Sequence, residues 1–195
     1  LRVAGITGTN GKTTTAFLLA QASDFLGRRG WYVGTLGHGH PGKVHEAGLT
    51  TPDAVTVQRR LAEARDAGAS TLGLEVSSHA LDQDRVAGVN FDTAVFTNRT
   101  RDHLDYHGTL AAYAAAKARL FHTPGLRCAV INVRDPFGRE LVERLDALAV
   151  ERILRAVREV KHAAVLEEPP DDRAHPQVLG PARNPRLEAA EPAHD

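Results

Sequence analysis

The chain has 195 residues, of which 42% are hydrophobic, enough for one domain with a single buried core. Lys and Arg number 24, as do Asp and Glu, and a net charge of zero argues against a dedicated nucleic-acid-binding protein. One cysteine excludes a disulfide framework, and no apolar run approaches the roughly 18 residues of a membrane helix. We therefore expect a cytoplasmic chain that binds neither nucleic acid nor membranes. Because it begins with Leu1 and contains no Met, we also expect a piece of a longer protein.

Strand and helix patterns alternate along the first 148 residues. The strand Val3 to Thr7 leads through a glycine-rich turn into a helix from Thr13 to Leu26. Further strands are predicted at 31–35, 70–76, 91–97 and 127–132, and further helices at 52–67, 110–121 and 136–148. Residues 36–51, rich in glycine, are predicted to form a long loop or a hairpin. Strands separated by helices of this length are typical of an α/β domain with a mainly parallel sheet flanked by helices.

The pattern changes beyond residue 148. Apolar residues at positions 150, 153, 154, 157 and 160 have helical spacing and predict a helical extension over 149–166. Residues 167–195 hold six of the ten prolines. Because proline fixes φ and removes a backbone donor, we expect an irregular or disordered tail there. The predicted organisation is a central domain over 1–148, expected to be incomplete, followed by the extension and the tail.

The strongest local motif lies between the first strand and the first helix, in Gly5-Ile-Thr-Gly-Thr-Asn-Gly-Lys-Thr-Thr14. Successive backbone N–H groups at a helix start form an anion site, and glycines let the backbone approach a phosphate. Lys12 can reach the terminal phosphates of a nucleotide, and the Thr13 hydroxyl can ligate Mg²⁺. Ile6 stands where the general phosphate-loop (P-loop) pattern has glycine, so the motif is a variant. The predicted nucleotide-binding residues are Gly8, Thr9, Asn10, Gly11, Lys12, Thr13 and Thr14.

A P-loop does not by itself define a reaction, because kinases, GTPases and many ATPases share it. A strand–turn–helix with ordinary turn glycines is the alternative without a ligand, and Gly-Lys-Thr in this context disfavours it. The sequence contains no kinase Lys–Glu–Asp set and no guanine-reading Asn-Lys-x-Asp segment. The reaction therefore has to be inferred from residues further along the chain.

Six more motifs follow the P-loop in a fixed order. They are Leu49-Thr-Thr-Pro52; Glu75-Val-Ser-Ser-His79 with Gln83 and Arg85; Phe96-Thr-Asn98; Arg101-Asp-His-Leu-Asp-Tyr-His-Gly108; and Tyr113 with Ala115-Ala-Lys117, before Ile131-Asn-Val-Arg-Asp135 closes the run. In this order and spacing they resemble the central ATP-binding domain of the Mur ligases, of the UDP-N-acetylmuramoyl-tripeptide synthetase type, over roughly residues 1–148. Folylpolyglutamate synthase and cyanophycin synthetase share the P-loop but fit the Ser-Ser-His and Asp-His-Leu-Asp-Tyr-His segments less well.

The resemblance implies an ATP-dependent ligase of peptidoglycan precursor synthesis. Such an enzyme adds the third amino acid to UDP-MurNAc-L-Ala-D-Glu through an acyl phosphate, so the implied cofactors and partners are ATP, Mg²⁺, the UDP-MurNAc-dipeptide and an amino acid. The implied catalytic residues are Lys12, His103 and Lys117. The implied Mg²⁺ ligands are Thr13, Glu75, His103 and a carbamylated Lys117. Asn98 is implied to contact the nucleotide, and the implied contacts with the dipeptide substrate are Thr50, Thr51, Ser77, Gln83 and Arg85.

Each of these residues also has an interpretation without a ligand. Glu75 could be a surface carboxylate at the end of a strand, and His103 could be a loop histidine that bonds to the backbone. Lys117 could be part of a solvated helix face. Thr50 and Thr51 fit the cap of the helix that follows them. Because ligands bind at the carboxyl ends of strands in open sheets, we expect Glu75 and His103 to gather there, within about 10 Å of Lys117.

Two features depart from the family pattern. Complete members have an N-terminal domain for the uridine and a C-terminal domain for the amino acid, and neither is present in this sequence. Arg99 and Thr100 also stand where Leu-Ser is commoner. Two alternatives therefore remain beside a ligase central domain: a truncated, non-catalytic homologue that binds ATP and Mg²⁺, and a ligase similar to folylpolyglutamate synthase. The sequence determines neither the amino acid added nor the oligomeric state.

Overall fold

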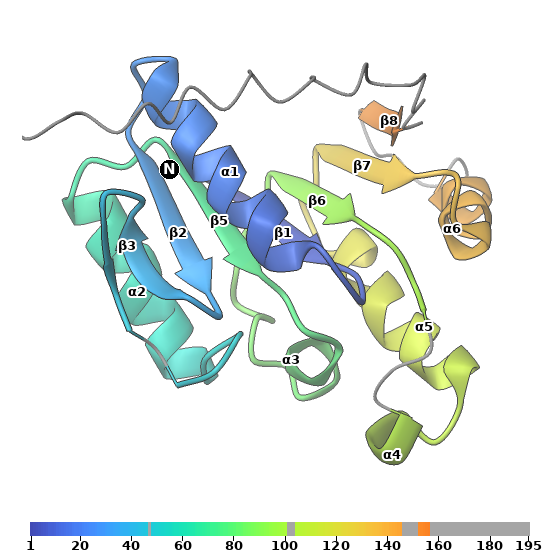
Figure 1. Ribbon diagram of the computed structural model, residues 1–195. Helices are drawn as coiled ribbons and strands as arrows, with labels where there is room; N and C mark the ends of the chain where they lie inside the picture. Colours follow the sequence, from blue (N-terminus) through green and yellow to red (C-terminus); the bar gives the residue numbers. More distant parts are fainter. Residues whose placement is uncertain (47, 101–103, 146–151, 157–195) are drawn as a thin grey trace, which may run out of the picture. The chain divides into compact units, whose positions relative to one another are not determined.

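The computed structural model of the chain describes residues 1–46, 48–100, 104–145 and 152–156. Within these ranges one sheet has eight strands in the order β4-β3-β2-β5-β1-β6-β7-β8 (Figure 1). Six strands are parallel to one another, and the β3–β4 hairpin continues the sheet antiparallel beyond β2. The strands are β1 (Arg2–Thr7), β2 (Gly30–Gly34), β3 (Gly37–His40), β4 (Lys43–His45), β5 (Thr71–Glu75), β6 (Thr93–Phe96), β7 (Cys128–Asn132) and β8 (Arg152–Ala156).

Helices cover both faces of this sheet. They are α1 (Lys12–Phe25), α2 (Ala54–Asp66), α3 (Ser78–Asp82), α4 (Leu104–His107), α5 (Leu110–Ala118) and α6 (Pro136–Leu145), and α5 continues into the 3₁₀ turn η1 (Arg119–His122). Because side chains alternate along a strand, β1 contributes to two cores. Its Ala4 and Ile6 belong to a small core with α1, whereas Val3 belongs to a larger core that also contains residues of α2, α5 and α6.

Helix α1 packs unusually close to the strands beneath it. A Cβ added to Gly30 of β2 would lie 2.0 Å from the carbonyl oxygen of Ala20, and one added to Gly73 of β5 would lie 2.5 Å from that of Ala16. Both helix residues are fully buried. Small residues on both sides therefore bring the backbone of α1 against the sheet, which fixes where the helix and its N-terminus lie.

Most predicted elements are present with ends shifted by a few residues, and residues 37–45 form the hairpin rather than the loop. The predicted helical extension over 149–166 is wrong where the chain is described, because residues 152–156 form β8, which pairs in parallel with β7. Helical spacing over so few apolar residues also fits a short strand, and the open edge of β7 supplies backbone partners that favour the strand. The sheet thus continues past residue 148, while the predicted tail over 167–195 lies outside the described residues.

Two short helices, α3 and α4, were not predicted, because four or five residues are too few to show a helical period. Neither they nor any other helix in the described ranges has both the length and the apolar character needed to cross a membrane.

We predict that Gly30→Ala lowers the free energy of unfolding by about 1–3 kcal/mol or more, because the new methyl group would overlap backbone that cannot turn aside. The matched control is Gly48→Ala, since no described atom lies within 4 Å of a Cβ at Gly48. Urea unfolding of the two variants measures the difference. Equal stability of Gly30→Ala and the parent chain would show that α1 can move away from β2.

Candidate active site

The P-loop connects β1 to α1 through two glycines whose backbone conformations suit no other residue. Gly8 has φ 148°, and a Cβ there would lie 1.9 Å from the Thr97 hydroxyl oxygen. Gly11 precedes α1 with φ 81°, in the left-handed region that favours glycine. Among the described residues no side chain caps α1. The first turn of such a helix presents N–H groups that suit an anion.

The segment after β6 holds the P-loop in shape. The Asn98 side chain accepts a hydrogen bond from the Asn10 backbone N–H (3.0 Å) and donates one to the Asn10 carbonyl (3.1 Å). Its backbone carbonyl accepts from the Thr9 N–H (2.8 Å), and the Thr97 hydroxyl donates to the Asn10 carbonyl (2.7 Å). Asn98, predicted to contact the nucleotide, thus contacts the loop directly and fixes the direction in which its N–H groups point.

Two lysines converge on one carbonyl of the P-loop. Lys12 Nζ donates to the carbonyl oxygens of Gly8 (3.1 Å) and Thr9 (2.9 Å). Lys117 Nζ, from α5, donates to the same Gly8 oxygen (2.8 Å) and lies 4.3 Å from the centroid of the Tyr113 ring. The Tyr113 hydroxyl in turn lies 3.1 Å from the Thr9 hydroxyl oxygen. Two cations at one loop make a local field that favours anions.

The interpretation of Lys117 as part of a solvated helix face is wrong, because the residue is only 1% exposed. Its ammonium group lies against the P-loop, at the Gly8 carbonyl. His103, predicted to join it, lies outside the described residues. Of the three residues predicted to converge, the structure describes two. Lys117 donates a hydrogen bond to the Gly8 carbonyl, and Glu75 accepts one from the Thr13 hydroxyl.

Glu75 ends β5 on the face that α1 covers, since it alternates with the buried Leu72 and Leu74 of the opposite face. It is 0% exposed, so its interpretation as a surface carboxylate is wrong. Oε1 accepts from the Tyr32 hydroxyl (2.5 Å) and the Thr35 backbone N–H (2.9 Å). Oε2 accepts a hydrogen bond from the hydroxyl of Thr13 (2.8 Å), which lies in the first turn of α1.

The surroundings of Glu75 are shaped to hold a carboxylate. A Cβ at Gly34 would lie 2.1 Å from Oε1, so glycine leaves the space that this oxygen fills. Burial and the hydrogen bond to Glu75 raise the pKa of Tyr32, so its hydroxyl stays protonated and remains a donor. Neither Tyr32 nor Thr35 was predicted as a site residue, because a tyrosine or threonine in a strand pattern gives no sign of its tertiary partner.

The Thr13 and Glu75 oxygens fit a Mg²⁺ ion. Both are hard oxygen donors, and neighbouring ligands of an octahedral Mg²⁺ with bonds of 2.0–2.1 Å lie about 3 Å apart, close to the separation observed here. No group of three or more His, Cys, Asp or Glu residues in the described part of the chain could hold a metal. Mg²⁺ usually binds one or two carboxylates and completes its shell with water and phosphate oxygens, so a single carboxylate beside a P-loop can hold it.

The residues predicted for the second substrate gather beside Glu75. The Thr51 hydroxyl donates to the Glu75 carbonyl (2.8 Å) and accepts from the Ser77 N–H (3.0 Å). Thr50 accepts from the Thr35 hydroxyl (3.0 Å). The interpretation of Thr50 and Thr51 as a helix cap is wrong, because the Asp53 side chain caps α2. The two threonines instead connect this segment to the end of β5.

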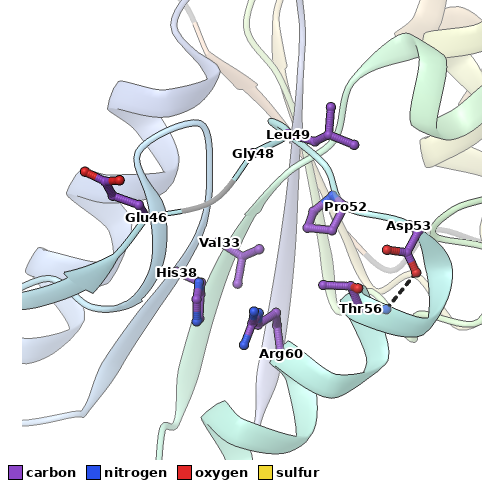
Figure 2. A pocket seen from close by; sticks show the side chains of 9 residues that line it. All are labelled: Val33, His38, Glu46, Gly48, Leu49, Pro52, Asp53, Thr56 and Arg60. Carbon is purple, nitrogen blue, oxygen red and sulfur yellow. Dashed lines mark hydrogen bonds between the residues drawn. The ribbon is translucent and has the colours of Figure 1, made fainter.

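Arg85 and Gln83 complete this group. Arg85 donates to the Thr51 carbonyl from Nη1 (3.0 Å) and to Gln83 Oε1 from Nε (3.0 Å). A separate cavity of about 330 Å³ lies between β2, β3, α2 and the residues that flank Thr50 and Thr51 (Figure 2). The described residues that line it include none of the predicted site residues.

The fold and the site define an α/β P-loop domain with a carboxylate buried beside the loop. The chain belongs to the Mur ligase family, because the model of the Mur ligase middle domain matches residues 6–170. The proposed resemblance is thereby confirmed.

Two curated relatives carry the name UDP-N-acetylmuramoyl-L-alanyl-D-glutamate–2,6-diaminopimelate ligase. The one from Ectopseudomonas mendocina is 58% identical over 144 residues, 74% of this chain and 30% of the relative. The one from Pseudomonas aeruginosa is 59% identical over 141 residues, 72% of this chain and 29% of the relative. A solved structure of a ligase with this name superposes with a TM-score of 0.73 at 41% identity, covering 80% of this chain and 31% of that one. The chain thus spans about 30% of the length of these relatives.

We predict that Tyr32→Phe lowers the free energy of unfolding by about 1–3 kcal/mol, because it removes a donor to the buried Glu75 and the acceptor of the Leu36 N–H. Tyr106→Phe is the matched comparison, since its hydroxyl bonds to the exposed side chains of Asp82 and Gln83, and we expect a smaller loss of stability there. Chemical denaturation measures both. Equal losses in the two variants would contradict a structural role of the Glu75 hydrogen bonds.

Proposed function

We propose that this chain is the central, ATP-binding part of a ligase that joins a carboxylate of a UDP-MurNAc-dipeptide to the amine of an amino acid. The observation that carries the proposal is the buried Glu75 carboxylate bonded to Thr13 at the start of the P-loop helix. The names of the relatives support UDP-N-acetylmuramoyl-L-alanyl-D-glutamate and 2,6-diaminopimelate as the two substrates.

In this proposal the backbone N–H groups of Gly8 to Thr14 and the Lys12 ammonium bind the ATP phosphates, with Asn98 fixing the loop. Thr13 and Glu75 would hold one Mg²⁺, and His103 with a carbamylated Lys117 would hold a second. Bound ATP supplies the phosphoryl group: a carboxylate oxygen attacks the γ-phosphorus with loss of ADP, and the amine then displaces phosphate from the acyl carbon, losing a proton. The residues of this chain bind and orient the ATP and the dipeptide substrate for these two steps.

The two lysines have different parts in the proposal. Lys12 exchanges its hydrogen bonds with the Gly8 and Thr9 carbonyls for bonds to phosphate oxygens by rotating its side chain. Lys117 attacks CO₂ through Nζ and releases a proton. The resulting carbamate replaces a cation with a carboxylate, the oxygen ligand that Mg²⁺ prefers. Burial of Lys117 against the P-loop supports this role.

The second substrate binds, in this proposal, at Thr50, Thr51, Ser77, Gln83 and Arg85. Arg85 supplies a planar, permanently charged group that suits a carboxylate or phosphate of the dipeptide substrate. Thr51 contacts the backbone of Glu75, so this group is anchored to the same strand end as the proposed Mg²⁺ ligand. The dipeptide's reacting carboxylate is thereby brought toward the P-loop.

We predict that Lys12→Ala weakens binding of Mg·ATP to the 195-residue chain by about 1.5–3 kcal/mol, because a charge-assisted contact with phosphate is lost. Lys43→Ala, an exposed lysine of β4, is the matched control and should bind like the parent. Isothermal titration calorimetry measures all three. Equal affinity of Lys12→Ala and Lys43→Ala would exclude Lys12 from the nucleotide site.

The ligase reaction needs a longer protein, so we propose to replace the matching segment of the Pseudomonas aeruginosa ligase with residues 1–145 of this chain. The chimaera should release ADP only when the dipeptide substrate and 2,6-diaminopimelate are both present. Lys117→Ala in the chimaera should abolish turnover and leave nucleotide binding largely intact, whereas Lys43→Ala should do neither. A folded chimaera that binds ATP but forms no product would support the non-catalytic alternative instead.

A further inference from the structure

The Tyr106 hydroxyl lies at the centre of a polar network that leads to Arg85. It donates a hydrogen bond to Asp82 Oδ2 (2.9 Å) and accepts one from Gln83 Nε2 (3.1 Å). Gln83 Oε1 then accepts from Nε and Nη2 of Arg85, and Nη1 of Arg85 donates to the Thr51 carbonyl. The network connects α4, the end of α3 and the segment before α2, three parts of the chain that are distant in sequence.

Hydrogen-bond chemistry allows one arrangement of this network. A carboxylate only accepts, so Asp82 takes the Tyr106 proton and leaves the phenolic oxygen as an acceptor. Gln83 must therefore turn its NH₂ group toward Tyr106, which turns its carbonyl oxygen toward Arg85. The opposite amide orientation would place NH₂ against the guanidinium, where donor faces donor. Tyr106 thus anchors the NH₂ end of the Gln83 amide, in the orientation in which the carbonyl oxygen faces Arg85.

This network holds Arg85 in place without using all of its donors. The bonds to Gln83 and Thr51 involve three of the five N–H groups of a guanidinium. In the described part of the chain no hydrogen bond uses the other two N–H groups, which can donate to an anion. The Tyr106 ring itself is fixed by contact with His79, with ring centroids 4.1 Å apart. Phenylalanine keeps this ring contact, so Tyr106→Phe changes the network and not the packing.

We propose that Tyr106 is a positioning residue for the anionic part of the UDP-MurNAc-dipeptide, acting through Gln83 to orient Arg85. The inference rests on the proposed function for the identity of the anion, and on the hydrogen bonds alone for the orientation of Arg85. We expect the loss of the Tyr106 hydroxyl to weaken binding of the dipeptide substrate and not of ATP, because the network has no described bond to the P-loop.

The orientation is tested first in the 195-residue chain, where no ligase activity is needed. ¹⁵N NMR of the Arg85 Nε–H should show a shifted resonance and faster exchange with solvent in Tyr106→Phe. The matched control is Tyr113→Phe, whose hydroxyl lies beside Thr9 in the P-loop, and it should leave the Arg85 signal unchanged. An Arg85 signal that is identical in Tyr106→Phe and the parent overturns the inference, whether or not the proposed ligase function is correct.

The effect on the substrate is tested in the chimaeric ligase. Tyr106→Phe should raise KM for the dipeptide substrate about 5- to 10-fold, as expected for one lost hydrogen bond, with kcat within about twofold and KM for ATP unchanged. Tyr113→Phe should show the opposite pattern, with KM for ATP raised. In a Gln83→Glu background, where both side-chain oxygens accept, adding Tyr106→Phe should change KM less than twofold. An active chimaera whose dipeptide KM is unmoved by Tyr106→Phe contradicts the inference, whereas an inactive parent chimaera contradicts the proposed function alone.

Discussion

The contact between Glu75 and Thr13 is the interaction on which the rest of the site depends. A carboxylate with no exposed surface is costly unless several donors compensate for the lost water. Here the donors come from β2, from the residue that follows it and from the first turn of α1. Gly34 leaves room for one carboxylate oxygen, and the small residues of α1 allow the helix to lie close enough to present Thr13. The core packing and the polar site therefore impose the same geometry.

A second constraint acts on the other side of the P-loop. The Gly8 carbonyl receives hydrogen bonds from two lysines, one within the loop motif and one from α5, more than a hundred residues later. Asn98 fixes the adjacent peptide groups. The loop is thus shaped from both sides before a nucleotide arrives, which reduces the conformational cost of binding. The proposed role of Lys117 needs this position, because a residue on the far face of α5 could not reach the phosphates.

The sequence predicted the parts of this structure that depend on local pattern. The glycines of the P-loop, the strand ending in Glu75 and the alternation of strands and helices all follow from motif and period. The strand β8 could not be predicted, because its five residues fit a helix as well and the open edge of β7 decided between them. The tyrosines were missed for a related reason. Tyr32 lies in an ordinary strand pattern, and Tyr106 lies in a motif that indicated the family without showing what each residue contacts. Their importance comes from partners at distant positions, Glu75 and Gln83.

The central claim is that the Thr13–Glu75 contact marks a metal site of the bound nucleotide. A crystal structure of the chain with Mn²⁺ in place of Mg²⁺ and a non-hydrolysable ATP analogue tests it most directly, because the anomalous signal of Mn²⁺ identifies the metal. The account predicts a peak about 2–2.5 Å from the Thr13 hydroxyl oxygen, with Glu75 turned from Thr13 to the metal or to a water bound to it. A metal bound elsewhere, with the hydrogen bond between Thr13 and Glu75 intact, would contradict the account.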